Sequence, residues 1–289
     1  MGSAPTQGLI WGAAAHDWAV LQEPAARPLW QMLLEAAEVG LGTRFLDAGC
    51  GSGGASVLAA QRGARVNGLD AAATLVGIAR TRVPDGDFRV GEIEALPYAA
   101  GTFDVVLACD VLPYAADPLA ALRELRRVCA PGGRVALSVW ATPEECAQAA
   151  IVAALNAVLP APLHVAWFAL TGPGELESLV AAAGLVVVEA GRVACVNDYA
   201  DAASAVQAVA AAGPVQAALR VIGVAHLQPA ILQALMRYRK RDGVVRLINA
   251  FQYITAASPG AGPATAATSR RRRRPGVRQR QGAADRHGS

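Results

Sequence analysis

The sequence is poor in the residues that build disulfide frameworks and metal clusters. Its five cysteines form no C-x-x-C pair, and their odd number and apolar neighbours indicate reduced thiols. The four histidines are scattered without an H-x-x-x-H spacing, so we expect no bound metal. These absences exclude a zinc-finger protein and a secreted domain held by disulfides.

Long apolar runs are also missing, although 54% of the residues are hydrophobic. No stretch of about 18 apolar residues occurs, so we expect neither a transmembrane helix nor membrane contact. The N-terminus lacks a basic segment followed by an apolar one, which predicts no signal peptide. A cytoplasmic location is the expectation that follows.

Charge is sparse and unevenly placed. The net charge is +3, yet residues 258–289 hold eight arginines and one aspartate, which leaves a net of −4 on residues 1–257. That tail has no hydrophobic periodicity, and we expect it to be disordered. Because the remaining body is acidic, we expect no nucleic-acid partner despite the arginine run at 270–274.

What the sequence does contain is an alternation of short apolar strands and amphipathic helices. Residues 1–12 are expected to be loose, and a helix is expected at 24–39. The predicted strands are 44–47, 65–69, 88–90, 103–109 and 134–140, with helices at 55–61, 72–82 and 118–128 between them. This alternation predicts an α/β fold with a doubly wound, mostly parallel sheet.

The second half changes character. Helices are predicted at 143–159, 173–183, 201–212 and 214–239, and strands at 185–196 and 244–255. The helices between the two late strands suggest a cap over a pocket. We therefore expect a helical lid at 1–40, a main domain at 41–257 with the cap at about 197–243, and a tail at 258–289.

The most informative segment is the glycine-rich turn after the first predicted strand, F-L-D-A-G-C-G-S-G-G at residues 45–54. Glycines here permit tight dihedrals and close approach of a ligand to the backbone. Gly49, Gly51 and Gly54 also satisfy G-x-G-x-x-G, so a dinucleotide site remains open. Asp70, which ends the next strand, is placed to accept hydrogen bonds from a ribose diol in either case.

Asp47 discriminates better between ligands. Its carboxylate, two residues before the first glycine, would repel a pyrophosphate at the helix N-terminus and favour a ligand with an amino group and a sulfonium. S-adenosylmethionine (SAM) has both groups and no phosphate. The alternative is that Asp47 simply caps nearby loop amides.

Further segments occur in a recognisable order: G-L-D at 68–70, G-E-I-E-A-L-P-Y at 91–98, G-T-F-D-V-V at 101–106 and A-P-G-G-R at 130–134. Together with the glycine loop, they resemble class I SAM-dependent methyltransferases, in particular the small-molecule methyltransferases of type 11. The resemblance covers about residues 40–142 and is vaguer from 143 to 257. It implies a Rossmann-like, doubly wound sheet of seven strands, mostly parallel with one antiparallel strand, and a helical cap insertion.

The resemblance also implies roles for individual residues. Glu92 would accept from the adenine amine, and the Ile93 amide would bind a ring nitrogen. Glu92 departs from the commoner Asp, and it could instead be a solvated loop acid. The resemblance implies that the methionine part of SAM is held by Asp47, Gly49, Cys50, Gly51 and Gly53. It implies that Asp70 and Ala71 lie at the ribose, and that Cys109 and Asp110 face the sulfonium.

Two residues are candidates for catalysis. Asp110, just past a strand end, could act as general base or could cap the 111–114 turn. His16 lies in a segment resembling the family's N-terminal lid and could act at the methyl-transfer face, or it could be structural. An aromatic wall suited to a planar or lipophilic acceptor could come from Tyr114, Trp140, His164, Trp167 and Phe168.

The sequence thus predicts a monomeric or homodimeric methyltransferase that moves a methyl group from SAM to oxygen, nitrogen or carbon of a small-molecule acceptor. Two alternatives stay open: an NAD(P)-dependent oxidoreductase, and a SAM-binding protein without catalysis.

Overall fold

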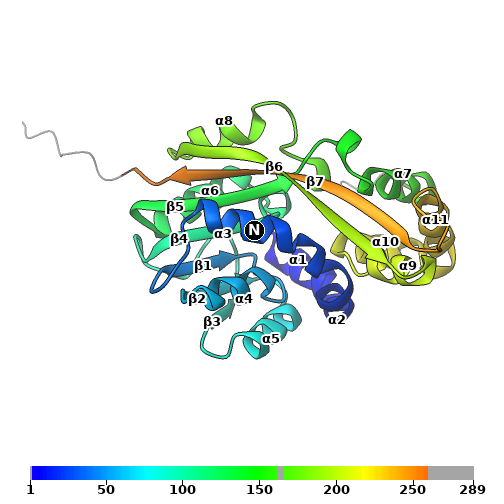
Figure 1. Ribbon diagram of the computed structural model, residues 1–289, viewed down its shortest axis with the longest axis horizontal. Helices are drawn as coiled ribbons and strands as arrows, with labels where there is room; N and C mark the ends of the chain where they lie inside the picture. The colour runs from blue at the N-terminus through cyan, green and yellow to red at the C-terminus, as the bar shows by residue number, and fades with distance from the viewer. Residues whose placement is uncertain (1, 162–165, 260–289) are drawn as a thin grey trace, which may run out of the picture.

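A computed structural model describes residues 2–161 and 166–259 of the chain. Seven strands form one sheet in the order β3-β2-β1-β4-β5-β7-β6 (Figure 1). They are β1 (Arg44–Ala48), β2 (Arg65–Asp70), β3 (Asp87–Val90), β4 (Phe103–Cys109), β5 (Cys129–Trp140), β6 (Val186–Tyr199) and β7 (Val245–Ala257). Only β7 runs antiparallel to its neighbours, β5 and β6. The predicted Rossmann-like sheet with one antiparallel strand is confirmed.

Helices cover both faces of this sheet. Leucines of α6 (Pro118–Val128) and α8 (Glu175–Ala182) are buried in the core of one face. On the other face the core contains side chains of α3 (Arg27–Ala36), α4 (Gly54–Gln61) and α5 (Ala73–Arg82). Strands covered on both sides must be apolar throughout, which explains the continuous apolar runs in the sequence.

The start of α6 shows how the local sequence sets an element boundary. Asp117 is its N-cap, and its carboxylate accepts hydrogen bonds of 3.0 Å from the N–H groups of Leu119 and Ala120. Pro118 occupies the first helical position, where no intrahelical donor is lost. The sequence predicted both ends of this helix correctly.

The cap packs as a separate cluster at one end of the long β6–β7 pair (Figure 1). It consists of α9 (Ala202–Ala210), α10 (Gly213–Ile222) and α11 (Val224–Met236), and α7 (Gln148–Val158) joins its core through Ile151 and Leu155. Within the described residues no single helix is long and apolar enough to cross a membrane, and one pair, α9 and α10, passes that test only as two helices bent by 91°.

Three local expectations were wrong. The single helix expected at 143–159 is interrupted, because Cys146 is extended and pairs with Asn249, so that α7 begins only at Gln148. Residues 1–12, expected to be loose, form the helix α1 (Ala4–Trp11), which is followed by the short α2 (Ala15–Asp17). The single helix expected at 214–239 is two helices, because Gly223 adopts φ +75 between α10 and α11. The expected disorder after residue 258 concerns a segment that lies, apart from Ser258 and Pro259, outside the described residues.

Candidate functional site

The glycine loop joins β1 to α4 in a conformation that only glycine adopts readily. Gly49, Gly51 and Gly53 have φ of +80, +54 and +86. A Cβ on Gly49 would lie 2.6 Å from a methyl group of Val111, so this position also lacks room for a side chain. The N–H groups of Gly49 and Cys50 donate to the carbonyl of Leu69 on β2, which fixes the loop against the next strand.

A cavity of about 150 Å³ opens beside this loop, over β1, β2 and β3; we call it the cofactor cavity. Its remaining wall is the N-terminal helix α1 with Trp11, followed along the chain by Trp18. Of the residues predicted from the sequence, those that line it are Gly49, Gly51, Asp70, Ala71, Glu92, Ile93, Cys109 and Asp110.

Two of these carboxylates accept hydrogen bonds from backbone N–H groups of the protein itself. Asp70 accepts from the N–H of Gly51 at 2.9 Å and from that of Ala72 at 2.8 Å. Glu92 accepts from the N–H of Ala4 at 2.8 Å, and therefore holds the first turn of α1 over the cavity. Glu92 is thus bonded to the lid and is not merely a solvated loop acid.

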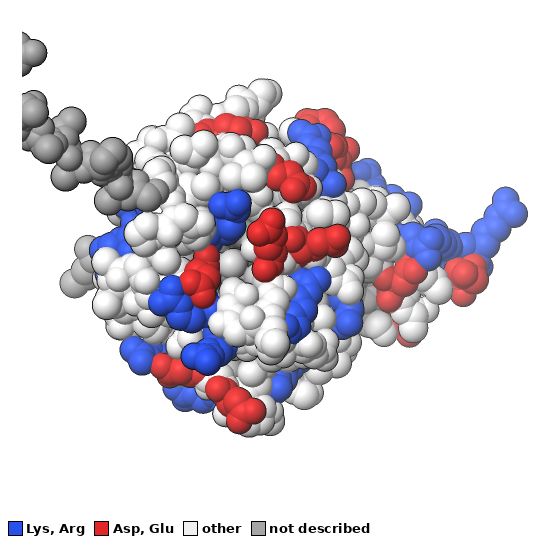
Figure 2. All heavy atoms as spheres, turned by 60° about the vertical axis from the view of Figure 1, so that its left-hand side comes forward, with Lys and Arg blue, Asp and Glu red and all other residues white. Residues whose placement is uncertain are grey.

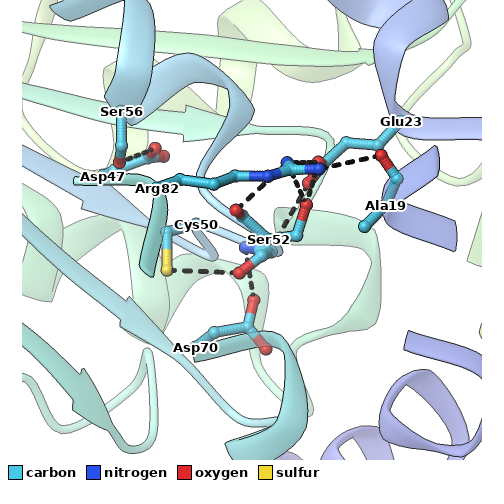
Figure 3. Close-up of polar contacts among 9 residues, drawn as sticks. Ala19, Glu23, Asp47, Cys50, Ser52, Ser56, Asp70 and Arg82 are labelled. Atoms are coloured by element: carbon cyan, nitrogen blue, oxygen red, sulfur yellow. Dashed lines mark hydrogen bonds and ion pairs between the residues drawn. The ribbon is translucent and has the colours of Figure 1, made fainter. Parts of the chain in front are cut away.

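Glu23 is a residue of the candidate site that the sequence did not predict. It lies in a short helical segment before α3, and its buried carboxylate accepts from the N–H of Ser52 at 2.9 Å and from the Ser52 hydroxyl (Figure 3). Arg82 forms an ion pair with it at 2.8 Å and donates to the carbonyl of Ala19 at 3.0 Å. Glu23 is 29 residues from its partner in sequence, and no local motif marks it.

Asp47 is buried at the end of β1, where its carboxylate accepts a 2.7 Å hydrogen bond from the hydroxyl of Ser56. Its pKa is raised to about 7, mainly by burial and also by the negative charges of Glu23 and Asp70, while the hydrogen bond from Ser56 opposes the shift. Within the described residues no basic side chain contacts it. Its partner is Ser56 in the first turn of α4, whose hydroxyl and backbone N–H both favour the ionised carboxylate, so Asp47 contacts this helix start and not the loop.

A second cavity of about 140 Å³ adjoins the first and shares Trp18, Gly49, Gly51, Cys109 and Asp110 with it. We call it the second cavity. Asp47 and Cys50 lie at one side, and the opposite side is formed by residues at the ends of β5, β6 and β7: Trp140, Cys195, Asn197 and Phe251. Among the described residues no three His, Cys, Asp or Glu side chains are placed so that they could hold a metal ion.

Asp110 stands at the junction of the two cavities, in the left-handed conformation with φ +55. Its N–H is held by the carbonyl and the hydroxyl of Ser138 on β5, at 3.0 and 3.1 Å. Burial raises the pKa of its carboxyl well above the ordinary value, and the neighbouring Trp140 opposes this only in part. Its carboxylate does not cap the 111–114 turn, because no hydrogen bond joins them.

Several predicted residues lie elsewhere. His16 is exposed and lines neither cavity. Gly53 starts α4 and allows it to approach Ala79 of α5. Of the proposed aromatic wall, Tyr114 lines the cofactor cavity and Trp140 the second; Trp167 is in the cap core, Phe168 packs on Trp140, and His164 lies outside the described residues.

Comparison with known sequences gives one matching family. The methyltransferase domain family matches residues 46–137. A Mycobacterium tuberculosis protein is 35% identical over 141 residues, which are 47% of this chain and 51% of that protein. A ubiquinone biosynthesis O-methyltransferase of Cereibacter sphaeroides is 37% identical over 154 residues, or 51% of this chain and 62% of the enzyme. The match therefore spans about half the length of the curated relatives.

Solved structures share the fold over more of the chain. A candidate methyltransferase of Bacillus halodurans superposes with a TM-score of 0.55 at 14% identity, covering 80% of this chain and 98% of that one. The cyclase SpnF gives 0.53 at 20% identity, covering 89% and 93%. At such identities the likeness concerns the fold alone.

Proposed function

We propose that this chain is a class I methyltransferase that transfers a methyl group from SAM to a small-molecule acceptor. The fold and the methyltransferase family matched over residues 46–137 support this proposal. When bound, SAM supplies an activated methyl group on a cationic sulfur. The chain's own residues then have to hold the nucleotide, neutralise positive charge and keep water out.

The observation that carries this proposal is the set of carboxylates around the glycine loop, Glu23, Asp47 and Asp70 (Figure 3). Three acids in one buried region favour a ligand with positive charge, because each carboxylate raises the cost of ionising the others. An ammonium and a sulfonium would remove that cost. Asp47 fits this role best, since it is buried and contacts no basic side chain in the described part of the chain.

The same acids disfavour a dinucleotide. A pyrophosphate would need the free N–H groups at the N-terminus of α4. Glu23 already accepts from one of them, that of Ser52, and would repel a phosphate there. The geometry therefore supports a phosphate-free nucleotide over NAD(P).

The remaining roles follow the walls of the cofactor cavity. Asp70 is proposed to hold the ribose hydroxyls, Glu92 the adenine amine and the Ile93 N–H a ring nitrogen. The tryptophans Trp11 and Trp18 would exclude water from the bound methyl group.

On the face seen in Figure 2, acidic and basic side chains are interspersed, as suits a protein that acts on a small molecule.

Titration calorimetry with SAM and with NADH tests the proposal. We expect SAM to bind the wild-type chain and NADH not to bind, and we expect Asp70→Asn to weaken SAM by about tenfold or more through the lost charge-assisted hydrogen bonds. The matched control is Asp85→Asn, an exposed aspartate away from both cavities. Binding of NADH in place of SAM would refute the proposal.

Turnover is tested separately, by mass spectrometry of metabolite extracts incubated with the chain and SAM carrying a deuterated methyl group. We expect at least one product heavier by the labelled methyl. Tight SAM binding with no labelled product from any extract would argue for a SAM-binding protein without catalysis.

A further inference from the structure

The second cavity continues the cofactor cavity and contains the acids proposed to face the cationic end of SAM. Glu23 and Asp47 line it, and it shares Asp110 with the cofactor cavity. The nucleotide of SAM is assigned to the cofactor cavity, so the second cavity is the space for its amino-acid end. That end carries an ammonium, which the acids attract, and a carboxylate, which they repel.

The described residues offer no basic side chain to this carboxylate. Neither cavity is lined by a described lysine, arginine or histidine. Arg82 is paired with Glu23 and donates to the carbonyl of Ala19, and it lines neither cavity (Figure 3). A base inside the second cavity would pair with Asp47 or Asp110 and so compete with the ammonium. The carboxylate is therefore left with neutral donors.

The short helical segment Trp18–Gln22 provides two such donors. It is a single π-helical turn, a feature that is frequent at functional sites, and both its first and its last residue line the second cavity. The indole N–H of Trp18 donates to no residue in the described part of the chain. It lies near the glycine loop, because its nitrogen would be 3.9 Å from a Cβ on Gly51.

The orientation of the Gln22 amide is set by two residues of β6. Its Oε1 accepts from the Tyr199 hydroxyl at 2.9 Å and from the Asn197 amide at 3.1 Å. Burial raises the pKa of Tyr199 to about 12, so this hydroxyl keeps its proton at neutral pH and can donate it to Gln22. With Oε1 occupied, the NH2 group of Gln22 is left over, and it donates to no residue that the structure describes.

We infer that the carboxylate of the cofactor's amino-acid end is bound by two neutral donors, the side-chain NH2 of Gln22 and the indole N–H of Trp18. This assignment rests on the proposed methyl transfer from SAM. Hydrogen bonds from neutral N–H groups to a carboxylate are charge-assisted, and they leave Asp47 unpaired for the ammonium. The segment Trp18–Gln22 therefore selects a cofactor that keeps its carboxylate over one that has lost it.

Binding of three ligands to the whole chain tests this assignment without turnover. They are S-adenosylhomocysteine, its decarboxylated analogue, and methylthioadenosine, which lacks the amino-acid end altogether. Dissociation constants are measured by titration calorimetry. The ratio of the constant of the decarboxylated analogue to that of S-adenosylhomocysteine is the carboxylate preference. We expect a preference of about tenfold or more in the wild-type chain.

Two variants locate this preference. Gln22→Glu still accepts from Tyr199 and Asn197 but places a second carboxylate against that of the ligand, so we expect the preference to reverse. Trp18→Phe removes the indole N–H and keeps an aromatic ring, and it should lower the preference by about threefold or more.

The matched control is Gln7→Glu, the same substitution in the wall of the cofactor cavity alone. It should leave the carboxylate preference within about twofold of the wild-type value, because the added charge lies outside the second cavity. Methylthioadenosine should bind Gln22→Glu about as well as wild type, which shows that the lid and the nucleotide site are intact in this variant.

The outcomes separate the carboxylate site from the proposed function. If S-adenosylhomocysteine does not bind the wild-type chain, the proposed function fails. If it binds no tighter than its decarboxylated analogue, the carboxylate site is refuted while the methyltransferase proposal stands. A preference that survives Gln22→Glu would place the carboxylate elsewhere. Equal weakening of all three ligands by Gln22→Glu would show that Gln22 only holds the lid, and would also overturn the assignment.

Discussion

Binding of the cofactor should be coupled to the release of a proton from Asp47. This carboxyl is buried, its pKa is raised to about 7 by burial, and the charges of Glu23 and Asp70 add to the shift. A ligand that brings an ammonium and a sulfonium next to it favours the ionised form and lowers its pKa. SAM binding therefore removes the proton that Asp47 carries near neutral pH.

The magnitude follows from the pKa. With a value of about 7 before binding, roughly one Asp47 in ten is ionised at pH 6 and about nine in ten at pH 8. If only the ionised form binds, the dissociation constant is about tenfold larger at pH 6 than at pH 8, or ~1.4 kcal/mol. Affinity thus falls as the pH falls through the pKa of the unbound form.

The assay is titration calorimetry at pH 6, 7 and 8 in buffers with different heats of ionisation, which also counts the protons released. The ligand's own α-amino group titrates near pH 7.7–8.0, but it does so with every variant. Asp47→Asn keeps the size of the side chain and removes its titration, so the difference from wild type isolates Asp47. Asp85→Asn, an exposed substitution, is the control. If wild type and Asp47→Asn show the same pH dependence, Asp47 does not hold the cation.

Three further results are expected. Between about pH 4 and 7 the folded chain keeps a proton on Asp47 that the unfolded chain has lost, so the free energy of unfolding falls as the pH rises through this window. Asp47→Asn should therefore stabilise the unliganded protein at pH 8 by up to about 4 kcal/mol, measured by urea unfolding. A stabilisation by Asn that is no larger at pH 8 than at pH 5 would contradict this. Leu125→Ala, at a fully buried position of α6, should cost about 2–5 kcal/mol in the same measurement, whereas a loss below about 1 kcal/mol would mean that the site collapses to fill the gap. Glu23→Gln should speed hydrogen exchange of the amides in residues 18–26 and leave the exchange of α6 unchanged. The control is Glu144→Gln, a substitution at an exposed position. Unchanged exchange in residues 18–26 would show that the ion pair with Arg82 does not hold this segment.

Much of the fold could be read from the sequence because its signals are local. The strand at 103–109 and the helix at 118–128 were predicted with the bounds they have, since apolar runs, a capping aspartate and prolines mark them. The break of α10 and α11 at Gly223 was missed, because one glycine inside a helical pattern does not by itself predict a positive φ. Helix α1 was missed because its docking over Ala71 and Glu92, and not its composition, holds it in place.

The sequence by itself determined the glycine loop, the alternating sheet and the position of Asp47 and Asp70 at strand ends, because all of these depend on residues close together in the chain. Only the tertiary structure decided that Glu23 meets Ser52, that Glu92 holds the lid, that His16 lines neither cavity, and that Asp110 stands beside Trp140 in a second cavity. These contacts join segments far apart in sequence. They depend on how whole helices pack against the sheet, and no local pattern of residues encodes that.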